Sequence, residues 1–164
     1  MLIKIKNKDT LIFDEFKLKC SIGKAGIKKN KIEGDNSTPK GIYKLGKLYW
    51  RADRVEKPNT KLVTKKINKK MGWCNDKNDK KNYNKLIKIK RKIKHEKLFR
   101  RDYKYDLMIP INYNTKKIKL GKGSAIFLHL TNKYKPTNGC VALNKKDFMI
   151  LLKIINKKTK IRLA

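Results

Sequence analysis

Short segments in which apolar and polar residues alternate dominate the first half of the chain. A period of two is typical of β-strands with one face buried. The segments that carry this pattern, or a short apolar run of similar length, are residues 2–6, 11–13, 16–22, 42–45, 47–50 and 86–90. Residues 23–41 contain Gly and Pro breakers and are predicted to form a loop. Residues 58–79 are polar and irregular, and residues 95–101 fit either a helical turn or a loop.

The last third of the chain has a clearer pattern. Residues 125–130 form an apolar run that predicts a buried strand, and residues 131–137 read as a loop closed by a proline. Residues 145–155 place apolar side chains at helical spacing, with Asn144 as a plausible N-cap. Residues 160–163 read as a final strand. The pattern as a whole predicts a mainly β protein with one helix near its end, organised as a single domain over residues 1–164 without internal repeats.

The chain carries an extreme positive charge, +33 over 164 residues. A polyanionic partner is one interpretation, and a general enrichment in Lys is the other. Only six of the 46 basic residues are Arg, and the Lys residues are spread over the whole chain rather than gathered in one arm. A nucleic-acid-binding surface usually concentrates its charge and uses Arg, so the second interpretation is favoured, with weak polyanion binding expected at low salt.

Targeting signals and the spacing of the cysteines bear on whether the chain is a membrane protein, a secreted protein or a zinc-binding protein. No run of eighteen apolar residues predicts a membrane span, and the first thirteen residues lack the continuous apolar core of a recognisable signal peptide. The three cysteines, Cys20, Cys74 and Cys140, do not have the spacing of a zinc site. Cys20 and Cys74 could form a disulfide, but two buried reduced thiols are favoured.

The segment with the clearest chemical content is GSAIFLHLTNKYKPTNGCVAL, residues 123–143. His129 lies near the end of the predicted strand, and Cys140 follows eleven residues later, after Thr137, Asn138 and Gly139. A neutral imidazole can take the proton of a thiol and activate it as a nucleophile. Gly139 allows a sharp turn, and the amide N–H groups of residues 138–140 could stabilise an oxyanion. Spacing alone would still favour a structural His and a core Cys.

The motifs around this pair resemble the L,D-transpeptidase catalytic domain family. The family pattern begins with a His, which is followed by a loop of variable length. The loop leads to four residues in a row: Ser or Thr, a position that is commonly His, then Gly and Cys. Here the pattern is matched by His129 and by residues 137–140. An upstream family element, an acidic-Gly-Asp stretch leading to Thr-Pro-x-Gly, matches EGDNSTPKGIY at residues 33–43. Shorter bacterial members also share patterns found here at residues 72–74, 76, 83–84, 95–96, 105–106 and 123–127. Asn138 stands where many relatives have His, and Ala142 where many have Arg or Asn.

This resemblance implies a curved β-sandwich with a helix after the catalytic Cys. It implies that Cys140 attacks a peptidoglycan stem peptide to form a thioester, with His129 as general base and no metal or organic cofactor. An amine acceptor then completes transpeptidation, or water completes L,D-carboxypeptidation. The substrate implies a periplasmic or cell-envelope location. A non-enzymatic, basic nucleic-acid-binding or polyanion-binding protein is the alternative from a different class.

A few further residues are candidates for substrate contact. His95 and Glu96 could orient a substrate, or His95 could be bound to its own loop. Tyr134, in the loop between His129 and Cys140, is predicted to line the pocket. Asp76 and Asp106 are expected to fix loops, and Trp73 to belong to the core. The sequence does not indicate an oligomeric state.

Overall fold

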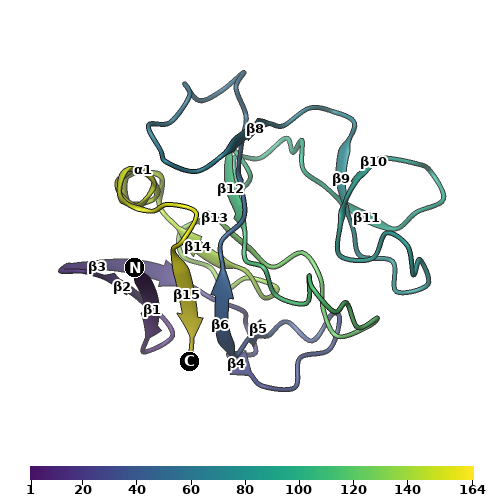
Figure 1. Ribbon diagram of the computed structural model, residues 1–164, viewed down its shortest axis with the longest axis horizontal. Helices are drawn as coiled ribbons and strands as arrows, with labels where there is room; N and C mark the ends of the chain where they lie inside the picture. The colour runs from purple at the N-terminus through teal and green to yellow at the C-terminus, as the bar shows by residue number, and fades with distance from the viewer.

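The computed structural model describes residues 1–164, and most of its strands join into one mixed sheet that curls on itself (Figure 1). This sheet has ten strands in the order β6-β15-β1-β2-β3-β14-β13-β12-β7-β8. Its strands are β1 (Leu2–Lys6), β2 (Thr10–Phe13), β3 (Phe16–Ser21), β6 (Gly41–Lys44), β7 (Leu48–Trp50), β8 (Thr64–Lys66), β12 (Leu107–Pro110), β13 (Phe127–Leu130), β14 (Val141–Leu143) and β15 (Lys160–Leu163). The expected mainly β fold is therefore confirmed, and the curved sandwich takes the form of a curled sheet.

Two smaller sheets complete the fold. β10 (Leu86–Lys88), β9 (Met71–Cys74) and β11 (His95–Lys97) form an antiparallel sheet in that order. β4 (Ile27–Lys28) and β5 (Thr38–Pro39) form a short parallel pair inside the predicted 23–41 loop. In Figure 1 the β9–β11 sheet lies on the far side of the central strands from the single helix.

The helix α1 (Lys145–Ile154) begins where the sequence predicts it. The Asn144 side chain accepts a hydrogen bond of 2.8 Å from the amide of Asp147, which satisfies one of the free N–H groups of the first turn. Phe148, Leu151 and Leu152 are buried on one face, as the helical spacing indicates. This ten-residue helix is the only one, and no helix is long and apolar enough to span a membrane.

The central strands β12 and β13 are buried on both faces, because two apolar clusters sandwich them. The main core contains 26 buried residues, and its members from β13 are Leu128 and Leu130. The second cluster contains nine buried residues under the β9–β11 sheet and includes Phe127 from β13. Burial on both faces explains why β12 and, apart from His129, β13 are apolar at successive positions rather than alternating. We refer to these clusters as the main core and the second cluster.

The sequence prediction is wrong where the second cluster forms. Residues 58–79 read as irregular, yet they contain β8 and the fully buried β9. Residues 95–101 read as a turn or loop, yet they begin with β11. β12 was not predicted at all, although all four of its residues are buried. The burial of β9 and β12 depends on packing against segments distant in the chain, which the pattern within each strand does not reveal.

Candidate active site

The register of β13 and β14 brings Cys140 and His129 to the same face of the sheet. The two strands are parallel, with Leu128 opposite Val141 and His129 opposite Ala142. Cys140 immediately precedes β14, so by the same register it lies opposite Phe127. His129 is two residues further along β13 than Phe127 and is therefore the diagonal neighbour of Cys140 on the same face. Since side chains alternate between faces, Cys140 and His129 both point away from the main core. The predicted pair is thus assembled by a direct strand pairing.

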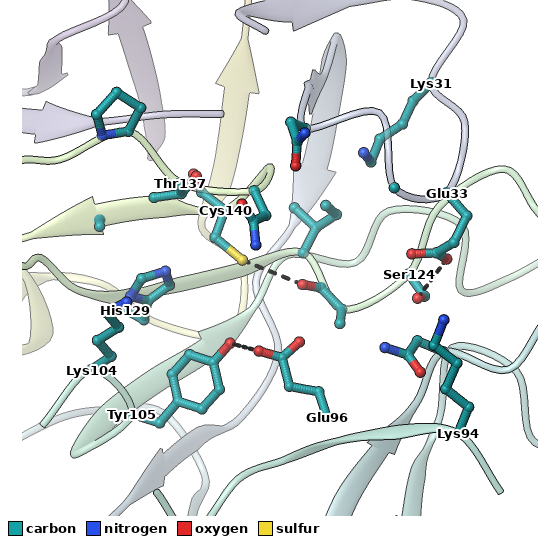
Figure 2. Close-up of a pocket in the computed structure, with 18 of the residues that line it drawn as sticks. Lys31, Glu33, Lys94, Glu96, Lys104, Tyr105, Ser124, His129, Thr137 and Cys140 are labelled. Carbon is teal, nitrogen blue, oxygen red and sulfur yellow. Dashed lines mark hydrogen bonds between the residues drawn. The ribbon is translucent and has the colours of Figure 1, made fainter. Parts of the chain in front are cut away.

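Both side chains line an open cavity of about 690 Å³. Figure 2 shows the His129 ring next to the Cys140 sulfur, with the Tyr105 and Glu96 side chains below them and Glu33 and Ser124 on the other wall. The loop of residues 135–138 and the exposed side chains of Lys77 and Lys94 also contribute to the lining. A thiol at this position can meet an incoming peptide.

The thiol of Cys140 is held between two backbone groups. The sulfur accepts a hydrogen bond of 3.3 Å from the Phe127 amide, and the thiol donates one of 3.3 Å to the carbonyl of Ala125. Burial raises the pKa of this thiol to about 12, and the negative charge of Glu96 acts in the same direction. The resting side chain is therefore a neutral thiol whose hydrogen atom points at a carbonyl.

His129 is fixed in one tautomer by its own strand. Its Nδ1 atom lies 2.8 Å from the carbonyl oxygen of Leu130, which can only accept, so Nδ1 carries the proton. Nε2 has no hydrogen-bond partner in the protein and is left with a free lone pair. The ring also meets Tyr105 edge-on, at a centroid distance of 5.4 Å. Burial lowers the pKa of His129 to about 4, so the imidazole is neutral at physiological pH and can accept a proton.

The turn before Cys140 is built by Thr137 and Gly139. The Thr137 hydroxyl donates a hydrogen bond of 2.6 Å to the Cys140 carbonyl and accepts one of 3.1 Å from the Gly139 amide. Gly139 has φ +141°, and a Cβ atom there would lie 2.7 Å from the carbonyl oxygen of Ser37. Only glycine fits this conformation and this close approach. Thr38 then ties the turn to β5, since its hydroxyl donates a hydrogen bond of 2.8 Å to the Gly139 carbonyl.

These contacts refine which amides are free to bind an oxyanion. The Gly139 amide is already used by Thr137, whereas the amides of Asn138 and Cys140 donate to no protein group. Free N–H groups next to the sulfur are the donors that a developing negative charge on a carbonyl oxygen requires. Asn138 itself is exposed at the rim of the cavity.

A buried asparagine that the sequence analysis did not single out as a functional residue shapes the floor of the site. The Asn84 side chain accepts hydrogen bonds from the Trp73 indole (3.0 Å) and the Ala125 amide (3.1 Å). It donates to the carbonyls of Tyr113 and Asn114. Ala125, whose carbonyl receives the thiol proton, has φ +52°, an unfavourable region for a residue with a side chain. Asn84 thus holds a strained residue in the position that orients Cys140.

Two of the predicted contact residues lie elsewhere. The Tyr134 side chain lines a separate cavity of about 440 Å³, and its hydroxyl accepts a hydrogen bond of 2.7 Å from Asn144. His95 does not line the large cavity, because it points to the opposite face of β11 from Glu96. Its Nδ1 atom lies 2.6 Å from the Ile93 carbonyl, which agrees with the loop-bound alternative.

The remaining cysteines and acidic residues have structural positions. Cys20 and Cys74 are both buried and are not bonded to each other. Asp76 accepts hydrogen bonds from the Asn78 and Lys94 amides, and Asp106 pairs with Arg54 at 3.0 Å, as expected of residues that fix loops. No group of three or more His, Cys, Asp and Glu side chains is arranged to hold a metal ion.

The protein has a curled, mainly β domain in which a thiol lies beside a neutral imidazole in an open cavity. These are features of the class of proteins that use a cysteine for chemistry on a bound ligand. Within that class, the chain matches the L,D-transpeptidase catalytic domain over residues 2–163. The protein therefore belongs to the L,D-transpeptidase catalytic domain family. No curated protein and no solved structure gives a match.

Proposed function

We propose that this protein is a peptidoglycan L,D-transpeptidase in which Cys140 is the nucleophile and His129 the general base. The observation that supports this most directly is the placement of His129 on β13 and of Cys140 immediately before the adjoining strand β14, where both side chains line a cavity large enough for a peptide. Family membership supports a stem peptide of peptidoglycan as the substrate.

In the first half of the reaction, Nε2 of His129 takes the thiol proton while the sulfur attacks the carbonyl carbon that follows an L-centre. Thiol and imidazole are both neutral at rest, so the proton has to move from the sulfur to Nε2 in the course of the attack. The amides of Asn138 and Cys140 stabilise the oxyanion. His129 then gives its proton to the leaving D-amino acid, and a thioester remains on Cys140.

In the second half, His129 deprotonates the acceptor that attacks the thioester. An amine from another stem peptide gives a new peptide bond and regenerates the thiol, whereas water gives a free carboxylic acid. Transpeptidase and L,D-carboxypeptidase therefore share the same acyl-enzyme and differ only in the acceptor. We also propose a periplasmic or cell-envelope location, because that is where the substrate is found.

Reaction with a carbapenem, followed by intact-protein mass spectrometry, tests the nucleophile. We expect one covalent adduct on the wild type, located at Cys140 by peptide mapping, and none on Cys140→Ala. Cys20→Ala is the matched control and should keep the adduct, because Cys20 is buried away from the cavity. An unmodified wild type, or an adduct that persists in Cys140→Ala, would contradict the proposal.

A further inference from the structure

The cavity contains two carboxylates that form no ion pair, although the chain is rich in lysine. Four ion pairs form in the structure, and their acidic members are Asp35, Asp53, Asp102 and Asp106. Neither Glu33 nor Glu96 takes part in one, yet both line the cavity. In a protein with 46 basic and 13 acidic residues, an unpaired, partly buried carboxylate is unexpected.

Each of these carboxylates is held in place by neutral hydroxyl groups. Oε2 of Glu33 accepts a hydrogen bond from the Tyr83 hydroxyl and one of 2.7 Å from Ser124. Oε1 of Glu96 accepts a hydrogen bond from the Tyr105 hydroxyl. The second oxygen of each carboxylate has no hydrogen-bond partner in the protein, so each side chain is positioned by one oxygen and presents the other.

The two carboxylates come from opposite walls of the same space. Glu33 lies in the loop between β4 and β5, whereas Glu96 projects from β11 across the cavity, below Cys140 (Figure 2). Burial is the largest cause of the raised pKa of Glu96. The charge of Glu33 also raises this pKa, whereas the charges of Arg100 and Lys104 lower it. Two like charges that face one cavity favour a cation between them.

A third hydrogen-bond acceptor at the cavity also favours a cationic ligand. The Oδ1 atom of Asn75, which follows β9, is buried and has no hydrogen-bond partner, and Asn75 lines the cavity. An unsatisfied buried oxygen calls for a donor from outside the protein. Glu33, Glu96 and Asn75 together present only acceptor oxygens, whereas an ammonium group offers three N–H donors and a positive charge.

The lysines near the cavity do not fill this position. The buried Lys31 side chain pairs with Asp35 at 2.8 Å, and Arg100 pairs with Asp102 at 2.6 Å. The side chains of Lys77, Lys94 and Lys135 are exposed at the rim, and the half-buried Lys104 forms no ion pair with either carboxylate. We propose that Glu33, Glu96 and Asn75 form a subsite for a primary ammonium group of the peptide substrates that react at Cys140. This inference rests on the proposed function and deepens it. The ammonium belongs either to a diamino-acid side chain of the acyl donor or to the amine of the acceptor.

Binding to the inactive Cys140→Ala variant tests the donor without any turnover. Calorimetry would compare two tetrapeptides that end in L-lysyl-D-alanine, one with a free side-chain amine and one with that amine acetylated. A donor ammonium in the subsite should make the free amine bind about tenfold more tightly. Adding Glu33→Gln or Glu96→Gln should bring the ratio close to one. The exposed Glu56→Gln is the matched control and should leave the ratio unchanged.

The acceptor source is tested on the acyl-enzyme of the wild-type protein. The thioester would be allowed to react with either methylamine or water, and mass spectrometry of the products would give the ratio of aminolysis to hydrolysis. If the acceptor amine occupies the subsite, Glu33→Gln and Glu96→Gln should lower this ratio about tenfold, and Glu56→Gln should not. Thermal unfolding of each variant shows that it is folded, and glutamine keeps a carbonyl oxygen for the tyrosine hydroxyls.

The outcomes separate the subsite from the proposed function. A preference for the free amine without any thioester in the wild type would support the subsite and contradict the acyl transfer. Thioester formation together with equal binding of both peptides and an unchanged acceptor ratio would overturn the subsite and leave the acyl transfer in place.

Discussion

The two faces of strand β13 differ in what they contact, although their residues alternate along a single segment. Leu128 and Leu130 pack into the main core of 26 buried residues. Phe127 packs into the second cluster of nine, and His129 on the same face reaches the cavity with Cys140. The residues that pack into the main core and the residue that reaches the cavity with Cys140 are therefore neighbours in sequence but lie on opposite faces of the strand. A substitution of His129 should therefore mainly reduce activity, whereas a substitution of a main-core residue should mainly reduce stability.

The largest effect is expected from the cavity face. Replacing His129 with Gln removes the proposed general base, so acylation of Cys140 should slow by about 10³-fold. The free energy of unfolding at pH 7 should change much less, because Gln can fill a similar volume. Stopped-flow acylation and urea unfolding would measure both quantities. Wild-type acylation in His129→Gln would mean that another group acts as the base.

The matching substitution on the other face is Leu128→Ala. Leu128 has no exposed surface, so its truncation leaves a cavity and should reduce the free energy of unfolding by about 2–5 kcal/mol. Acylation per folded molecule should stay near the wild-type rate at low temperature. Urea unfolding and active-site titration would test this, and a loss of acylation in the folded protein would show that the two faces are coupled.

A pH titration of stability would measure how much free energy the burial of His129 costs. Burial holds the pKa of His129 near 4 in the folded state, against an ordinary value of 6.5. Between these values the unfolded chain binds the extra proton, so stability should fall as the pH falls, by up to about 3 kcal/mol. Comparing the unfolding free energy of the wild type and His129→Gln from pH 7 to pH 4 isolates this contribution. Parallel curves would exclude it.

The smallest effect is expected at the start of α1, on the main-core side. Asn144→Ala removes the side chain that caps the Asp147 amide, which should lower the free energy of unfolding by about 1 kcal/mol. Asn144→Asp should retain most of the stability, since its carboxylate can cap the same amide. The same substitutions should leave carbapenem acylation unchanged. A shift above 2 kcal/mol would indicate that the Asn144 contact with Tyr134 also contributes.

Sequence patterns predicted the hairpin strands, the helix and its cap, because each has a period or a terminal signal confined to neighbouring residues. They failed for β9, β11 and β12, whose burial depends on the second cluster, formed by segments distant in the chain. The Cys140 and His129 pair was found through a motif. The sequence suggested that Glu33 either lines the substrate entrance or forms a turn, and it gave Asn84 no role in the site. The hydrogen-bond partners that define their positions, Ser124 and Ala125, lie more than forty residues away in the chain.

The position of β15 has a consequence for how the protein is made. β15 lies between β1 and β6, pairing in parallel with the first and antiparallel with the second. Until residues 160–163 leave the ribosome, two strands that were synthesised early both have unpaired edges. Exposed edges invite pairing with other chains. Before residues 160–163 have emerged, the nascent chain should therefore depend on chaperones, and deletion of these four residues should yield aggregates rather than a less stable folded protein.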